Sequence, residues 1–154
     1  MKKAIVFDID GTLADNSHRL HYIQGEKKDW NAFYDACAED KPTEEFLGFV
    51  RLLSKGIYED GTDECAIVIC TGRPEQIREI TERWFWKNFW FHPKPMYMRK
   101  DGDHRPDYEV KEEMIAQMRA DGYEPILAIE DRKQVVDMWR RNGIRCLQCA
   151  EGDY

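Results

Sequence analysis

The sequence predicts an α/β fold in which helices cover both faces of a parallel sheet. Short runs of apolar residues recur along the chain, and their length and composition are typical of buried strands. Between these runs, apolar residues recur every three or four positions, which indicates amphipathic helices. Strands that alternate with helices in this way predict a doubly wound sheet. A chain of 154 residues fits one domain, residues 1–154.

The first half of the chain contains one expected strand, a long connection and one helix. Residues 4–7 form the strand. Residues 15–42 are polar and aromatic and are too many for an ordinary connection, so we expect a small helical lid inserted after that strand. Thr43 is a suitable N-cap for a helix that ends near Gly56. An acidic loop follows at residues 58–64.

The second half repeats the alternation of strand and helix. The expected strands are residues 66–70, 96–98, 126–129 and 144–149. Three helices are expected. The first begins at Pro74, the second spans residues 109–120 before Gly122, and the third contains residues 135–139 and ends at Gly143. A charged loop at residues 99–107 precedes the second of these helices.

Composition and charge narrow the class of protein. The net charge of −7 argues against broad, nonspecific binding of nucleic acid, although one local basic pocket for a nucleic-acid end is compatible with it. No secretory signal or run of membrane-spanning length is seen, so we expect a soluble, cytoplasmic protein. The five cysteines, including the pair Cys146 and Cys149, are interpreted as structural because no second pair completes a zinc site.

Three of the expected strands run directly into polar residues. Asp8-Ile9-Asp10-Gly11-Thr12 follows the first strand, Thr71-Gly72-Arg73 the second, and Glu130-Asp131-Arg132 the strand at 126–129. Because parallel strands end at the same edge of a sheet, we expect these clusters to meet where open α/β folds bind ligands.

These residue types suit phosphoryl transfer. Asp8 and Asp131, with the backbone carbonyl of Asp10, are oxygen ligands suited to Mg²⁺. Asp8 can then attack phosphorus, and Asp10 can protonate the leaving oxygen and later activate water. Thr71 can donate a hydrogen bond to a phosphate oxygen, and Lys111 can neutralise charge that develops on the phosphoryl group.

The same residues resemble the four motifs of the haloacid-dehalogenase-like (HAD) phosphohydrolases, whose fold is Rossmann-like. Residues 7–13 resemble the first motif, residues 71–73 the second, Lys111 the third, and Glu130-Asp131 the fourth. A closer resemblance, carried by residues 102–113, by residues 131–141 and by the ending Gly152-Asp153-Tyr154, is to the phosphatase domain of phage-type polynucleotide kinase/phosphatases. That family removes 3'-phosphates from nucleic-acid ends.

The resemblance implies further site residues and also shows two departures. Arg19, Gly72 and Arg73 would contact the substrate phosphate, and Asp107, one helical turn before Lys111, would orient that lysine. Glu130 stands where the family usually has Asp, so its part as a metal ligand, direct or through water, is left open. The chain contains no Gly-x-x-x-x-Gly-Lys-Ser/Thr loop, so we expect no kinase half within it.

Several alternatives stay open at this point. Within the phosphatase class we favour a 3'-phosphorylated nucleic-acid end as the substrate, and a nucleotidase that acts on free mononucleotides is the second candidate. A receiver-like signalling domain is disfavoured because its acidic pair would precede the acceptor strand. In the lid, Trp30 and Tyr34 are candidates to stack on a base, whereas Phe33 is assigned to a small lid core. The aromatic residues at 84–91 are mostly core, with an exposed part that could form a dimer face, although the oligomeric state is not predicted.

Overall fold

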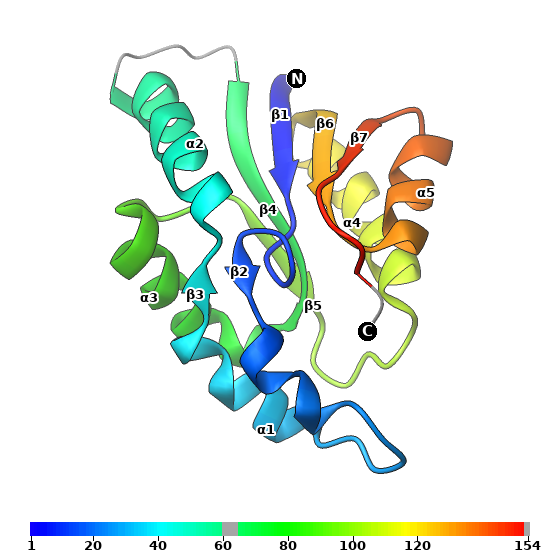
Figure 1. Ribbon diagram of the computed structural model, residues 1–154. Helices are drawn as coiled ribbons and strands as arrows, with labels where there is room; N and C mark the ends of the chain where they lie inside the picture. Colours follow the sequence, from blue (N-terminus) through cyan, green and yellow to red (C-terminus); the bar gives the residue numbers. More distant parts are fainter. Residues whose placement is uncertain (60–64, 153–154) are drawn as a thin grey trace.

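The computed structural model, described over residues 1–59 and 65–152, contains a five-stranded parallel sheet at its centre (Figure 1). The strands are β1 (Lys2–Phe7), β4 (Cys65–Pro74), β5 (Met96–Arg99), β6 (Tyr123–Glu130) and β7 (Arg145–Gln148), in the order β5-β4-β1-β6-β7. β1 therefore lies in the middle, hydrogen-bonded to β4 on one side and β6 on the other. The expected α/β fold with a parallel sheet is confirmed.

Two pairs of helices cover the two faces of the sheet. On one face lie α2 (Glu44–Ser54) and α3 (Arg78–Phe89), and on the other lie α4 (Asp107–Ala120) and α5 (Lys133–Arg141). Alternate residues of one strand serve opposite faces: Ala4 and Val6 of β1 pack towards α4 and α5, whereas Phe7 packs on the other side. A strand buried on both faces must be apolar throughout, which explains the unbroken apolar runs in the sequence.

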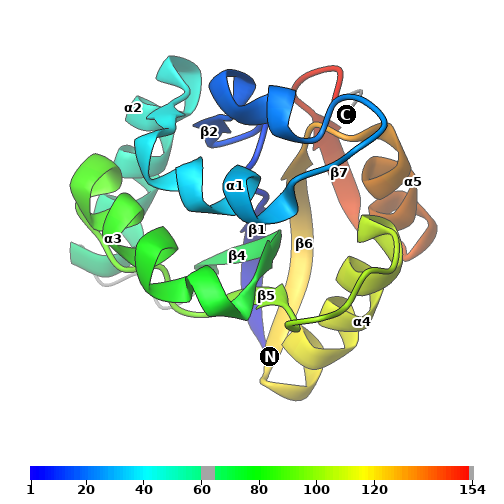
Figure 2. The same ribbon diagram turned by 90° about the horizontal axis from the view of Figure 1, so that it is seen from below.

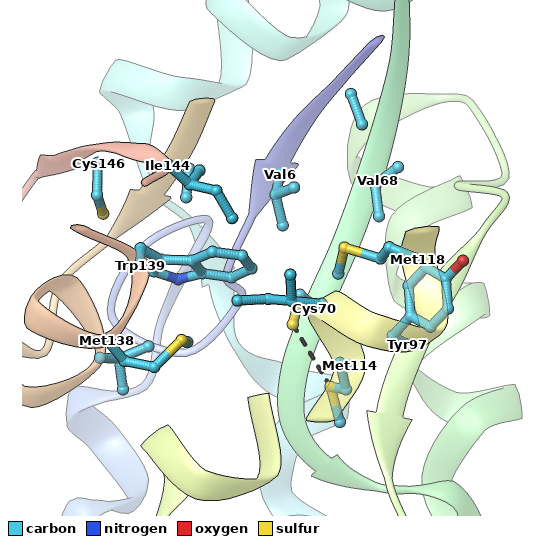
Figure 3. Close-up of a cluster of buried hydrophobic side chains, with 14 of the residues drawn as sticks. Val6, Val68, Cys70, Tyr97, Met114, Met118, Met138, Trp139, Ile144 and Cys146 are labelled. Atoms are coloured by element: carbon cyan, nitrogen blue, oxygen red, sulfur yellow. Dashed lines mark hydrogen bonds between the residues drawn. The ribbon is translucent and has the colours of Figure 1, made fainter. Parts of the chain in front are cut away.

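The core on the α4–α5 side is a mixed aromatic, aliphatic and sulfur cluster (Figure 3). Trp139 of α5 lies beside Val6 of β1 and is 1% exposed. Met118 of α4 belongs to the same cluster and is completely buried beside Tyr97 of β5. The contacts of these helices with the sheet fix α4, and so fix the position of Lys111 at its second turn.

The segment between β1 and α2 folds across the carboxyl edge of the sheet (Figure 2). Its ends pair as two short antiparallel strands, β2 (Ala14–Asp15) and β3 (Lys41–Pro42). Between them lie a 3₁₀ helix at Ser17–Tyr22, the helix α1 (Trp30–Asp35) and a 3₁₀ turn at Ala36–Glu39. The side chain of Asp29 accepts a hydrogen bond from the Ala32 N–H and caps α1.

The element boundaries differ from the sequence expectations in a few places. β4 extends to Pro74, and a 3₁₀ turn at Glu75–Ile77 precedes α3, so Pro74 ends a strand instead of entering a helix. α2 ends at Ser54 and a π-helical turn, Lys55–Glu59, follows it directly, so Gly56 lies within that turn. The Thr43 hydroxyl donates to the Thr12 carbonyl at 2.7 Å, and so does not cap α2.

Other expectations concern the ends and surface of the chain. The acidic loop at 58–64 falls largely outside the described residues, as do Asp153 and Tyr154 of the ending. No helix in the described ranges is long and apolar enough to cross a membrane. Trp84, Phe85 and Phe89 are buried as expected, whereas Trp86 and Trp90 are exposed.

We expect Met118→Ala to lower the free energy of unfolding by about 3 kcal/mol, because it removes a fully buried side chain and leaves a cavity between α4 and the sheet. Urea unfolding of the two proteins measures the difference. Leu52→Ala, at a residue that is 73% exposed, is the control and should change stability by less than about 0.5 kcal/mol. Equal losses in both variants would contradict this description of the core.

Candidate active site

The first motif begins where β1 ends. The Asp8 N–H donates to the Ile129 carbonyl of β6 at 3.1 Å, so the sheet pattern holds the backbone of Asp8 in place. The chain then turns sharply: Gly11 has a φ of +85°, a conformation that side chains disfavour, and its N–H donates to the Ala14 carbonyl. The turn leaves Asp8 and Asp10 at the carboxyl edge of the central strand.

Lys111 is buried at this edge and is shared by three carboxylates. Its Nζ lies 2.6 Å from Asp8 Oδ1, 2.8 Å from Glu130 Oε2 and 3.3 Å from Asp107 Oδ2. Burial alone would lower the pKa of Lys111, but the carboxylates of Asp107, Asp8 and Glu130 raise it well above that of a free lysine. The ammonium therefore stays charged and fixes the acids that surround it.

One ammonium does not balance the acidic groups that meet here. Oxygens of Asp8, Glu130 and Asp131 lie within 4.8 Å of one another, and all three residues are buried. Burial, and then the charge of Glu130, raise the pKa of Asp8 well above its usual value. Burial also raises the pKa of Glu130 to about 7, although Lys111 opposes it. Three crowded oxygen donors of this kind could hold a hard divalent cation.

Asp10 lies outside that acidic cluster and is held by two arginines. Arg19 Nη2 lies 2.5 Å from Asp10 Oδ1, and Arg73 contacts both carboxylate oxygens, with its Nη2 2.6 Å from Oδ1. Burial would raise the pKa of Asp10, but the guanidinium groups of Arg73 and Arg19 lower it to about 2. Both arginines are fully buried beneath the site, where they position Asp10.

Asp40 holds the two arginines and was not predicted from the sequence. Its carboxylate accepts from Arg19 Nε at 2.7 Å, from Arg73 Nη2 at 2.8 Å and from His18 Nε2 at 2.9 Å. The Asp40 carbonyl also accepts from the indole N–H of Trp84 on α3 at 2.7 Å. Asp40 therefore connects residues 14–42, which run from β2 to β3 and are called the 14–42 segment below, to the body of the protein.

The second motif places Thr71, Gly72 and Arg73 at the end of β4. The Thr71 hydroxyl accepts the Arg73 N–H at 3.2 Å, which leaves its own hydrogen available to a phosphate oxygen. A β-carbon at Gly72 would overlap the Asp107 carboxylate, so glycine is needed for that close approach. Arg99, also not predicted, donates to the Gly72 carbonyl at 3.0 Å and to Asp107 Oδ1 at 3.0 Å.

A cavity of about 460 Å³ opens above these residues, within the usual size range for small-ligand sites. Asp8, Asp10, Gly72 and Asp107 form part of its lining. The 14–42 segment supplies one wall through Ile23, Gln24, Lys28, Trp30, Asn31, Phe33 and Tyr34. The loop between β5 and α4 supplies the facing wall, which includes Lys100, Gly102, Asp103, His104, Arg105 and Pro106. The structure thus brings together the residues predicted for the site. Those that are buried and do not line the cavity are Arg19, Thr71, Arg73, Lys111, Glu130 and Asp131.

Comparison with known proteins identifies the family. The family model described as the polynucleotide kinase PNKP phosphatase domain, of HAD type, matches residues 2–154. The chain belongs to this family. It is accordingly a HAD phosphatase, and the expected class of enzyme and the resemblance found in the sequence are confirmed.

Individual relatives agree with this assignment. A protein of Autographa californica nuclear polyhedrosis virus, assigned as a bifunctional polynucleotide kinase/RNA ligase, is 25% identical over 138 residues, which are 90% of this chain and 18% of that protein. A chain of the Pnkp1/Rnl/Hen1 RNA repair complex is 26% identical with a TM-score of 0.79, and the match covers all of this chain and 44% of that one. This chain therefore spans less than half the length of these relatives.

The fold extends to more distant phosphatases. The class C acid phosphatase of Bacillus anthracis has a TM-score of 0.65 at 16% identity, with 99% of this chain and 68% of that chain covered. At this identity the likeness concerns the fold alone.

We expect Asp8→Asn to raise the melting temperature in EDTA by about 3 °C, because it removes a charge that the crowded site disfavours. Since the folded-state pKa of Asp8 is raised, ionised Asp8 opposes folding above the pKa of an unfolded aspartate, and this effect fades as pH falls towards about 4. The gain measured by thermal unfolding should therefore be larger at pH 8 than at pH 5. Asp137→Asn, on the exposed side of α5, should show no gain; a lower melting temperature for Asp8→Asn at pH 8 would contradict the account.

We expect Gly72→Ala to lower phosphatase activity on an aryl phosphate about 100-fold, because the new methyl group displaces Asp107 and disturbs Lys111. Steady-state kinetics measure the loss, and urea unfolding checks that the variant remains folded. Gly48→Ala on α2, where a β-carbon meets nothing within 4 Å, is the matched control and should keep full activity. Unchanged activity in Gly72→Ala would show that Asp107 does not need its present position.

Proposed function

We propose that this phosphatase is a Mg²⁺-dependent phosphomonoesterase that works through a phospho-aspartate on Asp8 and removes 3'-phosphates from nucleic-acid ends. The observation that carries the proposal is the position of Asp8: it ends the central strand, is held by Lys111, belongs to the acidic cluster and faces the cavity. A carboxylate so placed is accessible to a phosphate on one side and fixed on the other.

The residues at the edge fit a magnesium ion. Asp8 and Asp131 would bind it through carboxylate oxygens, and Glu130 is close enough to act directly or through a water molecule. The Asp10 side chain is engaged by the arginines, so its part in metal binding falls to its backbone carbonyl. A bound cation would relieve the crowding of acids and neutralise charge on the phosphate. Burial raises the pKa values of Asp8 and Glu130, and a divalent cation beside them would favour their ionised forms.

The protein residues account for two chemical steps. In the first, an oxygen of Asp8 forms a bond to phosphorus while the bond from phosphorus to the 3'-oxygen breaks, and Asp10 supplies the proton that this oxygen gains. In the second, Asp10 takes a proton from water, the water oxygen bonds to phosphorus, and inorganic phosphate leaves Asp8. Lys111 and the Thr71 hydroxyl stabilise the negative charge that develops on the phosphoryl oxygens.

The two arginines keep Asp10 in place for both steps. Their charge holds Asp10 ionised before substrate binds. The guanidinium groups of Arg19 and Arg73 suit phosphate geometry, but both are fully buried and neither lines the cavity, so a phosphate could reach them only after Asp10 has moved. Loss of one contact would raise the pKa of Asp10, which could then take a proton from the phosphate monoanion or from solvent and pass it to the leaving oxygen in the first step. Gly72 lines the cavity, and its lack of a side chain lets the Asp107 carboxylate lie against it.

The 14–42 segment is proposed as a lid, with residues 15–42 as an insertion in a single domain of residues 1–154. It lies over the carboxyl edge and forms one wall of the cavity (Figure 2). A lid of this kind limits the access of water to a phosphorylated intermediate.

The choice of a nucleic-acid end rests on the family and on the cavity walls. The family is named for polynucleotide kinase, and one relative belongs to an RNA repair complex. The cavity walls carry Lys28, Lys100 and Trp30, groups suited to phosphates and bases. A nucleotidase that accepts free mononucleotides is the second candidate, because the cavity also has room for such a molecule.

We expect phosphate release from a 3'-phosphorylated oligonucleotide to require Mg²⁺ and to exceed release from 3'- and 5'-mononucleotides. In Asp8→Asn the rate should fall at least about 1000-fold because the nucleophile is lost. Acid quenching with a ³²P-labelled 3'-phosphate should trap label on the parent protein and none on Asp8→Asn.

Each part of the proposal has its own contrary result. Retained turnover in Asp8→Asn would exclude the covalent mechanism. Full activity in EDTA would exclude the metal. Preference for mononucleotides would leave the covalent mechanism intact and would favour the second candidate function, a nucleotidase.

A further inference from the structure

The wall formed by the 14–42 segment contains an exposed aromatic platform. Trp30 is 44% exposed and lines the cavity. It stacks on Tyr34 with ring centroids 5.9 Å apart and an interplanar angle of 27°, and meets Phe33 edge-on at 5.7 Å. Burying one face of an indole on other rings while its remaining surface borders a cavity leaves an apolar plane available to a planar ligand.

This platform is rigidly connected to the reacting residues. Phe33 is buried, and the guanidinium carbon of Arg19 lies 4.1 Å from the centre of its ring. Arg19 Nη1 also donates to the Phe33 carbonyl at 3.2 Å, and the same arginine holds Asp10. A ligand group that rests on Trp30 is therefore held at a fixed offset from Asp10 and from the phosphate site beside it.

The facing wall is fixed as well. Arg99 donates to the carbonyls of Asp103 and Arg105 at 3.1 and 2.7 Å, which closes the loop between β5 and α4 upon itself. Arg105 in turn binds Asp103 and Glu113. The slot between the two walls therefore exists before any ligand binds, which lowers the entropic cost of binding.

Two lysines border the slot. Lys28 stands on the wall of the 14–42 segment, with its Nζ 5.8 Å from the centre of the Trp30 ring, and Lys100 stands on the facing loop; both are exposed. Within the parts of the chain that the structure describes, neither lysine forms an ion pair with a carboxylate. By contrast, Arg99 and Arg105 in the same wall are neutralised by Asp107, Asp103 and Glu113. On a protein of net charge −7, two such lysines at one cavity are suited to a second anionic group.

We propose that Trp30 is the platform for the base of the terminal nucleotide, and that Lys28 and Lys100 bind the phosphodiester that joins this nucleotide to the next one. The inference rests on the proposed 3'-phosphatase function and makes it more specific. The preferred substrate is an oligonucleotide of at least two nucleotides with a base on its last residue. A mononucleotide lacks the phosphodiester, and an abasic end lacks the group that stacks.

Four substrates with the same terminal phosphate separate these contacts. They are the thymidine dinucleotide 3'-phosphate, its analogue with an uncharged methylphosphonate linkage, its analogue with a terminal abasic residue, and thymidine 3'-monophosphate. We expect the parent protein to have the highest kcat/KM on the dinucleotide and a value about tenfold lower on each of the other three, because each lacks one contact or more.

Variants assign each contact to a residue. Trp30→Ala should lower kcat/KM about tenfold on the dinucleotide and leave the abasic analogue unchanged, and Trp30→Phe should restore most of the loss. Lys28→Ala and Lys100→Ala should each lower kcat/KM on the dinucleotide and leave the methylphosphonate analogue unchanged. Trp86→Ala is the matched control, because Trp86 is an exposed tryptophan of α3 outside the cavity lining, and it should behave as the parent protein.

The contrary outcomes are distinct. If Trp30→Ala loses the same factor on all four substrates, the residue only supports the fold of its segment and the platform is excluded. If the parent protein hydrolyses all four equally, the base and phosphodiester contacts are excluded while the 3'-phosphatase function stands. If it releases phosphate from none of them, the proposed function and this inference both fail.

Discussion

The site depends on one buried ammonium group. Lys111 brings together Asp8 from the end of β1, Glu130 from the end of β6 and Asp107 from the start of its own helix. Burying that many carboxylates without a cation would be prohibitively unfavourable, and burying the lysine without the carboxylates would discharge it. The packing of α4 against the sheet brings the Lys111 ammonium to the sheet edge. The position of the charged site therefore depends on the hydrophobic core beneath it.

A second buried arrangement controls Asp10. Two arginines and Asp40 form a compact network in which the charges of the 14–42 segment meet those of β4. The two acids of the first motif thus have opposite surroundings: one lies among carboxylates and the other between guanidinium groups. Two carboxyl groups only two residues apart are in this way prepared for different chemical tasks, as pairs of acids in other phosphate- and sugar-cleaving sites require.

Much of this structure could be predicted from the sequence, for physical reasons that differ between parts. The buried strands are apolar on both faces, so β1, β4 and β6 were apparent, and their polar endings indicated where Asp8, Thr71 and Asp131 would meet. Asp40 and Arg99 carried no such signal. Asp40 is one acid among several in a polar segment, and only the return of that segment towards residues 19 and 73 gives it its two arginine partners. Thr43 stands at the N-cap of α2 as expected, but its hydroxyl forms a tertiary hydrogen bond instead of a cap. Pro74 was misassigned because β4 extends to it.

The short pairing of Ala14 with Pro42 and of Asp15 with Lys41 has a consequence for how such an enzyme can diversify. The two ends of the 14–42 segment lie side by side. The length of the segment therefore does not alter the register of any strand in the central sheet. Insertions and deletions there change what reaches over the catalytic edge and leave the reacting groups on the strands where they are. Substrate range and chemistry can therefore change independently in this architecture, provided that the ion pair between Arg19 and Asp40, near the two ends of the 14–42 segment, is retained.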